Sequence, residues 1–173
     1  MSEPMDHFAR FGLPCRYAVD RKALDVAYER LSFEQHPDLQ AAAPPEQQQA
    51  AQQRSAELNE AYRMLCNENE RGAYLLGLLA GGRKLNLEAL PDGFLKAMFM
   101  LQEEIEELDP ADTKGRASLK TDVDEKLTLV LAERAALFAQ VDGRPAGADL
   151  EVLQQVQSNL NEERYLRRLL DRL

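Results

Sequence analysis

Apolar residues recur every three or four positions through nearly all of the 173 residues, and this helical spacing is the feature that most constrains the fold. No stretch alternates between apolar and polar residues for long enough to predict a strand. Leu and Ala are frequent and Trp is absent, a composition that favours helices over an aromatic-rich β-sandwich. The sequence therefore predicts an all-α protein.

The N-terminal part, residues 1–79, predicts an antiparallel pair of long helices between two short ones. Asp20 is a good N-cap for the first long helix, which must end near Gln35 because Pro37 disfavours the α conformation at the residue before it. After a loop, Pro45 or Glu46 can open the second long helix, because proline is tolerated in the first turn. The inward stripes of the two helices are Leu24, Ala27, Tyr28 and Leu31, and Ala51, Ser55, Leu58, Tyr62 and Leu65.

The C-terminal part, residues 92–173, predicts three helices with short connections, which is the pattern of a helical bundle. Residues 80–91 are expected to form a linker, and Asp92 is expected to cap the first helix. Residues 142–145 are expected to form a turn before the last helix, which Asp149 caps. The middle helix has a stripe at near-heptad spacing, formed by Leu119, Val123, Leu127, Val130, Leu137 and Val141. In the last helix we expect two stripes, rotated from each other around the polar run 161–164: Leu150, Leu153, Val156 and Leu160, and then Leu166, Leu169, Leu170 and Leu173.

Charge and residue spacing exclude several classes of function. A net charge of −9 with a pI near 4.8 argues against nucleic-acid binding, which needs a clustered basic surface. The longest apolar run, residues 73–82, is too short to span a bilayer, and no secretory signal is recognisable. His7, His36, Cys15 and Cys66 lack the spacing of metal ligands, so we expect no metal site. We expect both cysteines to be reduced, although a disulfide between Cys15 and Cys66 stays open.

The tripeptide His36-Pro37-Asp38 is the first candidate site. Alone it fits an ordinary turn at the end of a helix, but it lies between two amphipathic helices that are flanked by short ones. The residues that carry the match are Asp6-His7-Phe8, Phe11-Gly12-Leu13, Tyr17, Asp20, Tyr28, Leu31, the tripeptide itself, Leu58-Asn59-Glu60-Ala61-Tyr62 and Leu65. In this order they resemble a J domain, the module by which co-chaperones act on DnaK-type chaperones.

Further residues extend the resemblance over nearly the whole chain. They are Phe11-Gly12-Leu13-Pro14 with Tyr17, Arg71-Gly72-Ala73-Tyr74-Leu75-Leu76, and Phe94-Leu95 leading into Gln102-Glu103-Glu104. With the acidic bundle they are similar to the HscB family of iron–sulfur cluster co-chaperones. The resemblance implies that the chain is a cytoplasmic adaptor and not an enzyme, and that it needs no cofactor. Its J domain would stimulate the ATPase of an HscA-like chaperone, and its bundle would hold an IscU-like cluster scaffold and deliver it.

For the chaperone end, the resemblance points to His36, Pro37 and Asp38. Proline fixes the backbone there, and an exposed carboxylate is a natural partner for an arginine. A second candidate contact is the outer face of the preceding helix, formed by Lys22, Val26, Arg30 and Phe33. The alternative is that this face is solvated and its apolar residues are incidental. This helix departs from the usual basic J-domain pattern because it also carries Asp20, Asp25, Glu29 and Glu34, and because Leu39 follows the tripeptide.

For the scaffold end, helical spacing singles out Leu95 and Phe99. They lie about 100–140° from the bundle seam, which is formed by Phe94, Met98, Leu101, Ile105 and Leu108. An apolar patch bordered by charge indicates an interaction site. The resemblance implies that Leu95, Lys96 and Phe99, with Tyr165 on the last helix, contact the scaffold. The alternative is that Leu95 and Phe99 pack against the linker or the J domain.

Other functions stay open from the sequence. The chain could be a J-domain co-chaperone with a different client, or a helical structural adaptor in which the tripeptide is incidental. An enzyme has little support, because the sequence contains two histidines, no Gly-rich phosphate loop and no visible pairing of a nucleophile with a base.

Overall fold

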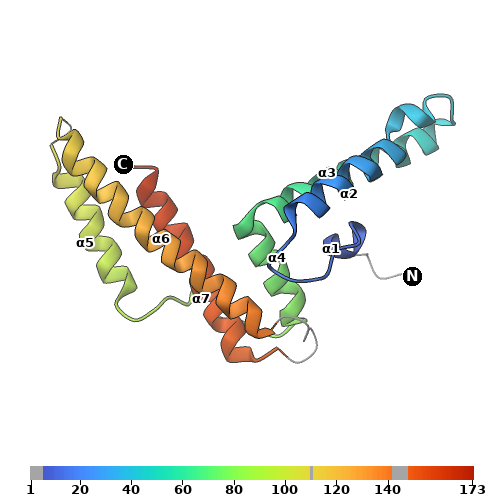
Figure 1. The fold of residues 1–173 in the computed structure, drawn as a ribbon. Coiled ribbons are helices and arrows are strands. Elements are labelled where there is room, and N and C mark those ends of the chain that lie inside the picture. The colour runs from blue at the N-terminus through green and yellow to red at the C-terminus, as the bar shows by residue number, and fades with distance from the viewer. Residues whose placement is uncertain (1–5, 110, 142–147) are drawn as a thin grey trace. The chain divides into compact units, whose positions relative to one another are not determined.

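The computed structural model describes residues 6–109, 111–141 and 148–173, and these residues contain helices and no strand, as predicted (Figure 1). The chain divides into two compact units, one up to Leu75 and one from Leu76, which we call the first and the second unit. The helices are α1 (His7–Arg10), α2 (Arg21–Glu34), the 3₁₀ helix η1 (Pro37–Gln40), α3 (Pro45–Cys66), α4 (Glu68–Ala80), α5 (Phe94–Glu107), α6 (Thr113–Val141) and α7 (Leu150–Leu170).

In the first unit, α2 and α3 form the predicted antiparallel pair. Arg21 and Tyr28 bond along α3 in reverse order, to the Tyr62 hydroxyl at 3.1 Å and to Asn59 at 2.9 Å. The predicted cap is confirmed, because the Asp20 carboxylate accepts bonds from the first backbone N–H groups of α2. The core takes residues from both stripes and from the chain around α1, which are Phe8, Phe11, Tyr17, Leu24, Ala51, Leu58 and Leu65. Ala61 of α3 and Leu75 of α4 complete it. The η1 turn after α2 was not predicted.

A buried arginine joins the loop before α2 to the junction of α3 and α4. The Arg71 guanidinium donates to the Tyr17 carbonyl at 2.9 Å and to the Leu65 carbonyl, and lies 5.1 Å from the centre of the Tyr17 ring. At the chain start, the His7 ring stacks on Tyr74. These contacts fix the frame from which α2 and η1 extend.

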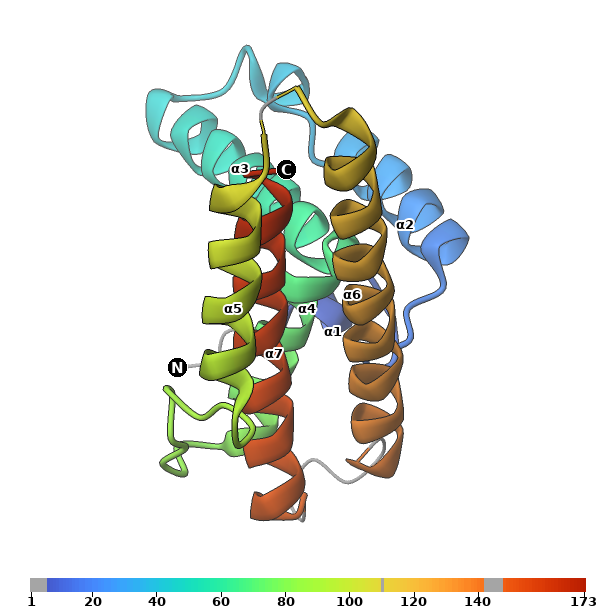
Figure 2. The ribbon, with the colours of Figure 1, turned by 90° about the vertical axis from the view of Figure 1, so that its left-hand side faces the viewer.

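In the second unit, α5, α6 and α7 form an up-down-up bundle (Figure 2). The α6–α7 pair is antiparallel, and α5 runs parallel to α7: the Phe94 ring lies 5.9 Å from Tyr165, and Glu106 binds Arg172 farther along. Apolar side chains of all three helices fill the core, which consists of Met98, Ile105, Leu119, Val123, Leu127, Val130, Leu166 and Leu169.

The α6–α7 seam contains a buried charge network that the sequence did not predict. The side chains of Arg134 and Glu163 are both 0% exposed and form an ion pair across the two helices. Arg134 also donates to Asn159 at 2.9 Å, and Glu163 accepts from Arg167 at 2.6 Å. Glu163 lies between the two predicted stripes of α7, and most members of both stripes are buried or half-buried: Leu153, Val156 and Leu160 in the first, and Leu166, Leu169, Leu170 and Leu173 in the second.

Residues 81–91, which we call the strap, lie along α7. Arg83 donates to the Ala148 carbonyl at 2.7 Å, and Asn86 exchanges two bonds with Gln154. Asn161 donates to the Leu87 and Ala89 carbonyls, both at 2.9 Å. The segment predicted to be a linker is therefore tied to the bundle by side-chain bonds.

Two other local expectations have different outcomes at the ends of the bundle helices. The N-cap of α5 is Gly93 with φ +76°, a left-handed conformation that suits glycine, so the expected cap by Asp92 is wrong. Asp149 caps α7 by accepting from the N–H of Glu151 at 3.0 Å. The turn predicted over 142–145 lies outside the described residues.

Candidate functional site

The His36-Pro37-Asp38 tripeptide forms a compact projection at the end of α2. Pro37 is the first residue of η1, and His36 is its N-cap, with Nδ1 accepting the Asp38 backbone N–H at 3.2 Å. In a neutral ring this bond leaves the proton on Nε2. The Asp38 side chain is 89% exposed and lies 3.6 Å from His36 Nδ1. The carboxylate is therefore held on a short turn and is open to a cationic partner.

The predicted outer face of α2 is exposed, and its apolar members are prominent. Lys22, Val26, Arg30 and Phe33 all lie on the surface, with Phe33 78% exposed. Leu39, on η1, is also exposed. This surface places large apolar side chains next to the tripeptide.

The charges of α2 are largely paired within the unit. Arg30 binds Glu34 at 3.2 Å, and Arg21 binds Asp25 at 2.8 Å. The Tyr62 hydroxyl and Arg21 together hold the pKa of the Asp25 carboxyl below its usual range, because both donate hydrogen bonds to the charged form. Little of the positive charge on this helix is left for a partner.

The structure brings three of the four predicted scaffold residues together between α5 and α7. Leu95 and Phe99 are 56% and 61% exposed, and Tyr165 is half-buried beside them. All three line a pocket of about 380 Å³ with Met98, Gln102, Arg168, Leu169 and Arg172. Lys96 is exposed but does not line this pocket.

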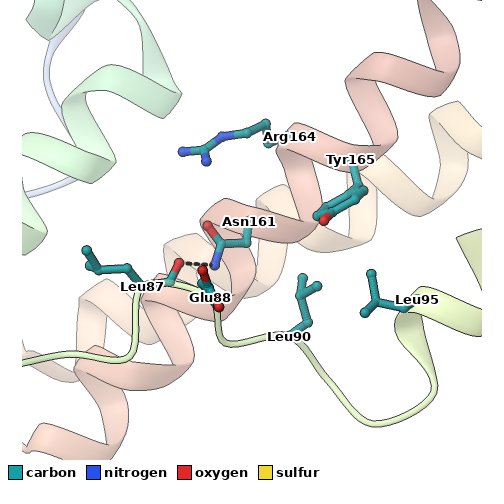
Figure 3. Close-up of a pocket in the computed structure, with 7 residues that line it drawn as sticks. All are labelled: Leu87, Glu88, Leu90, Leu95, Asn161, Arg164 and Tyr165. Atoms are coloured by element: carbon teal, nitrogen blue, oxygen red, sulfur yellow. Dashed lines mark hydrogen bonds between the residues drawn. The ribbon is translucent and has the colours of Figure 1, made fainter.

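A second pocket, of about 310 Å³, adjoins the first because Leu95 and Tyr165 line both (Figure 3). Its other walls come from the strap and from α7: Leu87, Glu88, Leu90, Asn161 and Arg164. We call the two pockets together the α5–α7 groove. Leu95 thus lines the pocket beside the strap. Even so, Leu95 and Phe99 each keep more than half of their surface exposed.

Sequence reasoning missed the strap wall and the arginines of this groove. The spacing of Arg164, Arg168 and Arg172, four residues apart, was the available signal, since such residues share one helix face. Nothing in the sequence pattern indicated that residues 87–90 would lie against α7.

The described residues contain no group of three or more His, Cys, Asp or Glu side chains placed to hold a metal ion. Cys15 is exposed and Cys66 is half-buried, and the two do not form a disulfide. Among the described helices, none combines the length and apolar character needed to cross a membrane.

Together, a four-helix unit with an exposed H-P-D turn and a three-helix bundle make up the fold of this chain. Two solved structures share it. Chaperone HscB from Vibrio cholerae is 24% identical, with a TM-score of 0.77, over 96% of this chain and 94% of that chain. Human co-chaperone protein HscB is 20% identical, with a TM-score of 0.80, over 98% of this chain and 81% of that chain.

No protein-family model matches the chain. The structural likeness nevertheless covers both units, and the chain therefore has the HscB fold. The resemblance inferred from the sequence is confirmed at the level of the fold.

Proposed function

We propose that this chain is a co-chaperone that stimulates the ATPase of a DnaK-type, HscA-like chaperone and brings it an IscU-like iron–sulfur cluster scaffold. The observation that carries the proposal is the exposed His36-Pro37-Asp38 turn in a chain with the HscB fold over almost its full length. In this proposal both ends act by binding, and the chain performs no covalent chemistry.

At the chaperone end, Asp38 offers both carboxylate oxygens to an arginine of the ATPase, while Pro37 and the His36 cap limit the motion of the turn. Stimulation requires that the turn bind one state of the chaperone better than the other. Val26 and Phe33 add apolar area to this contact, in place of the charge that is already paired within α2.

The test at this end is the steady-state ATPase of the purified HscA-like chaperone. We expect His36→Gln and Asp38→Asn each to abolish stimulation. Asp92→Asn, which neutralises an exposed aspartate of the second unit, is the control and should leave stimulation intact. Full stimulation by the His36→Gln variant would overturn the proposal in favour of a structural adaptor.

At the scaffold end, Leu95, Phe99 and Tyr165 form the apolar floor of the α5–α7 groove. Exposed apolar area of this kind gains free energy when a partner covers it. Phe99 and Tyr165 are the anchors we expect to contribute most, since aromatic residues are enriched among interface hot spots.

The test at this end is calorimetric titration of the purified IscU-like scaffold. The double change Leu95→Ala, Phe99→Ala should weaken binding by about 1–3 kcal/mol for each true anchor. Leu129→Ala removes a leucine of α6 that is more exposed than Leu95 and lies outside the groove, and this variant should bind like the wild type. A scaffold that never binds, with ATPase stimulation intact, would leave a J-domain co-chaperone with a different client.

A further inference from the structure

The α5–α7 groove has a charged side as well as an apolar floor. Arg164 lines the pocket next to the strap, and Arg168 and Arg172 line the pocket next to Phe99. The three arginines are spaced four residues apart on α7, so the Cα atoms of neighbouring arginines lie about 6 Å apart along the helix axis. A row of positive charge on a chain with a net charge of −9 is a local reversal of sign.

The arginines of this helix differ in what they bind. Arg172 pairs with Glu106 at 2.8 Å, and Arg167, on the adjacent face, pairs with buried Glu163. Within the described residues, Arg164 and Arg168 form no ion pair. Glu88 is the acidic side chain that lines the Arg164 pocket, and none of the ion pairs of the described residues joins it to that arginine.

The surroundings of these two arginines favour a carboxylate over a hydrated counter-ion. Arg168 lies over the Tyr165 ring at 5.9 Å, and Arg164 lines a pocket with Leu87, Leu90 and Leu95 (Figure 3). A guanidinium is weakly hydrated and binds a carboxylate through two parallel bonds. A partner that covers the apolar floor would remove water from both arginines, and carboxylates on that partner would compensate the loss.

We propose that the α5–α7 groove receives a surface of the scaffold on which apolar side chains lie beside carboxylates, and that Arg164 and Arg168 each pair with one of those carboxylates. This inference rests on the proposed scaffold-binding function. It adds that the partner is chosen by charge as well as by apolar contact, and that the charge contribution comes from α7.

The experiment titrates the purified IscU-like scaffold into the full chain at 50 mM and 500 mM NaCl. We expect Arg164→Gln, Arg168→Gln to weaken binding at least tenfold in low salt, and the difference from the wild type to shrink in high salt, because salt screens exposed charge pairs. Arg164→Lys, Arg168→Lys keeps the charge without the planar fork and should lie between the two. The apolar variant Leu95→Ala, Phe99→Ala should lose affinity at both salt concentrations.

The matched control is Arg54→Gln, which removes an exposed arginine of α3 that forms no ion pair in the described part of the chain. Circular dichroism melting checks that each variant is folded. If the doubly substituted arginine variant binds like Arg54→Gln while the apolar variant fails, the charge proposal is overturned and the proposed function stands. If the wild-type chain does not bind the scaffold at either salt concentration, both are overturned.

Discussion

The helix pairs α2–α3 and α6–α7 are both antiparallel, but polar groups occupy opposite places in them. Between α2 and α3, Tyr28 stacks on Tyr62 with ring centres 4.0 Å apart, and the two hydroxyls bond at the rim, to Asn59 and Asp25. Between α6 and α7, Arg134 and Glu163 are paired at 0% exposure. One pair of helices is apolar at the centre, and the other carries charge there.

The difference matters for how each pair chooses its alignment. An apolar seam can slide by a turn at modest cost, whereas a buried charge that loses its partner costs several kcal/mol. Our hypothesis is therefore that Arg134 and Glu163 restrict α6–α7 to one register, and that they add specificity of alignment without adding net stability. The α5–α7 groove depends on that register, since its α7 residues are Asn161, Arg164, Tyr165, Arg168, Leu169 and Arg172.

The largest effect is expected from breaking the central ion pair. Arg134→Met leaves Glu163 buried with Arg167 alone, and should reduce the free energy of unfolding by about 3–5 kcal/mol. Adding Glu163→Leu should restore most of the loss, because no buried charge then lacks its partner. Urea unfolding followed by circular dichroism measures both. Equal losses in the single and double variants would show that the arginine acts through packing.

A smaller change in the free energy of unfolding, of opposite sign, is expected at Glu162, which lies beside the network. Burial, with the nearby charge of Glu133, raises the pKa of Glu162 to about 6. Because the ionised form is disfavoured in the folded state, this carboxyl lowers the free energy of unfolding. The penalty is full above the folded pKa and disappears as pH falls to the pKa that the carboxyl has in the unfolded chain. Glu162→Gln should therefore add about 1 kcal/mol of unfolding free energy at pH 7.5, after allowance for partial exposure.

Unfolding measurements at pH 7.5 and pH 5 check this sign. The gain from Glu162→Gln should be clear at the higher pH and small at the lower. Glu125→Gln, an exposed glutamate of α6, is the control, and we expect it to change little at either pH. A gain that is the same at both pH values would exclude the electrostatic explanation.

The smallest effect is expected at the rim of α2–α3. Tyr62→Phe removes a hydroxyl that donates to Asp25 at 2.8 Å and accepts from Arg21 at 3.1 Å, and should cost about 0.5–1 kcal/mol. The pKa of Asp25, followed by NMR titration, should rise in this variant because one donor to the carboxylate is lost. Tyr28→Phe, whose hydroxyl bonds neutral Asn59, should leave that pKa unchanged.

The sequence predicted most of the local features that a single residue determines, although the cap of α5 is Gly93 and not Asp92. Asp20 and Asp149 cap helices as expected, Pro45 begins α3, and α2 ends before Gln35. Leu95 and Phe99 are exposed because their angle on α5 points them away from the seam. Each of these outcomes depends on the chain within a few residues, which is the range that a sequence pattern describes.

The missed features depend on a second segment far along the chain. The near-heptad stripe of α6 has a gap between Val130 and Leu137 that Arg134 fills, but only Glu163 on α7 makes its burial possible. The polar run 161–164 suggests a solvated face, and yet Asn161 is buried because strap carbonyls accept its amide. Likewise, spacing alone cannot tell that Arg167 is paired and Arg164 is not.

The strap also sets the smallest piece of chain that can carry the complete groove. A fragment beginning at Asp92 would retain α5, α6 and α7, but would lack Leu87, Glu88 and Leu90, which form one wall. Asn161 would lose both of its carbonyl partners and face water. The groove is therefore shared between a bundle and the residues that lead into it, and dissection of the chain must cut upstream of the strap to preserve it.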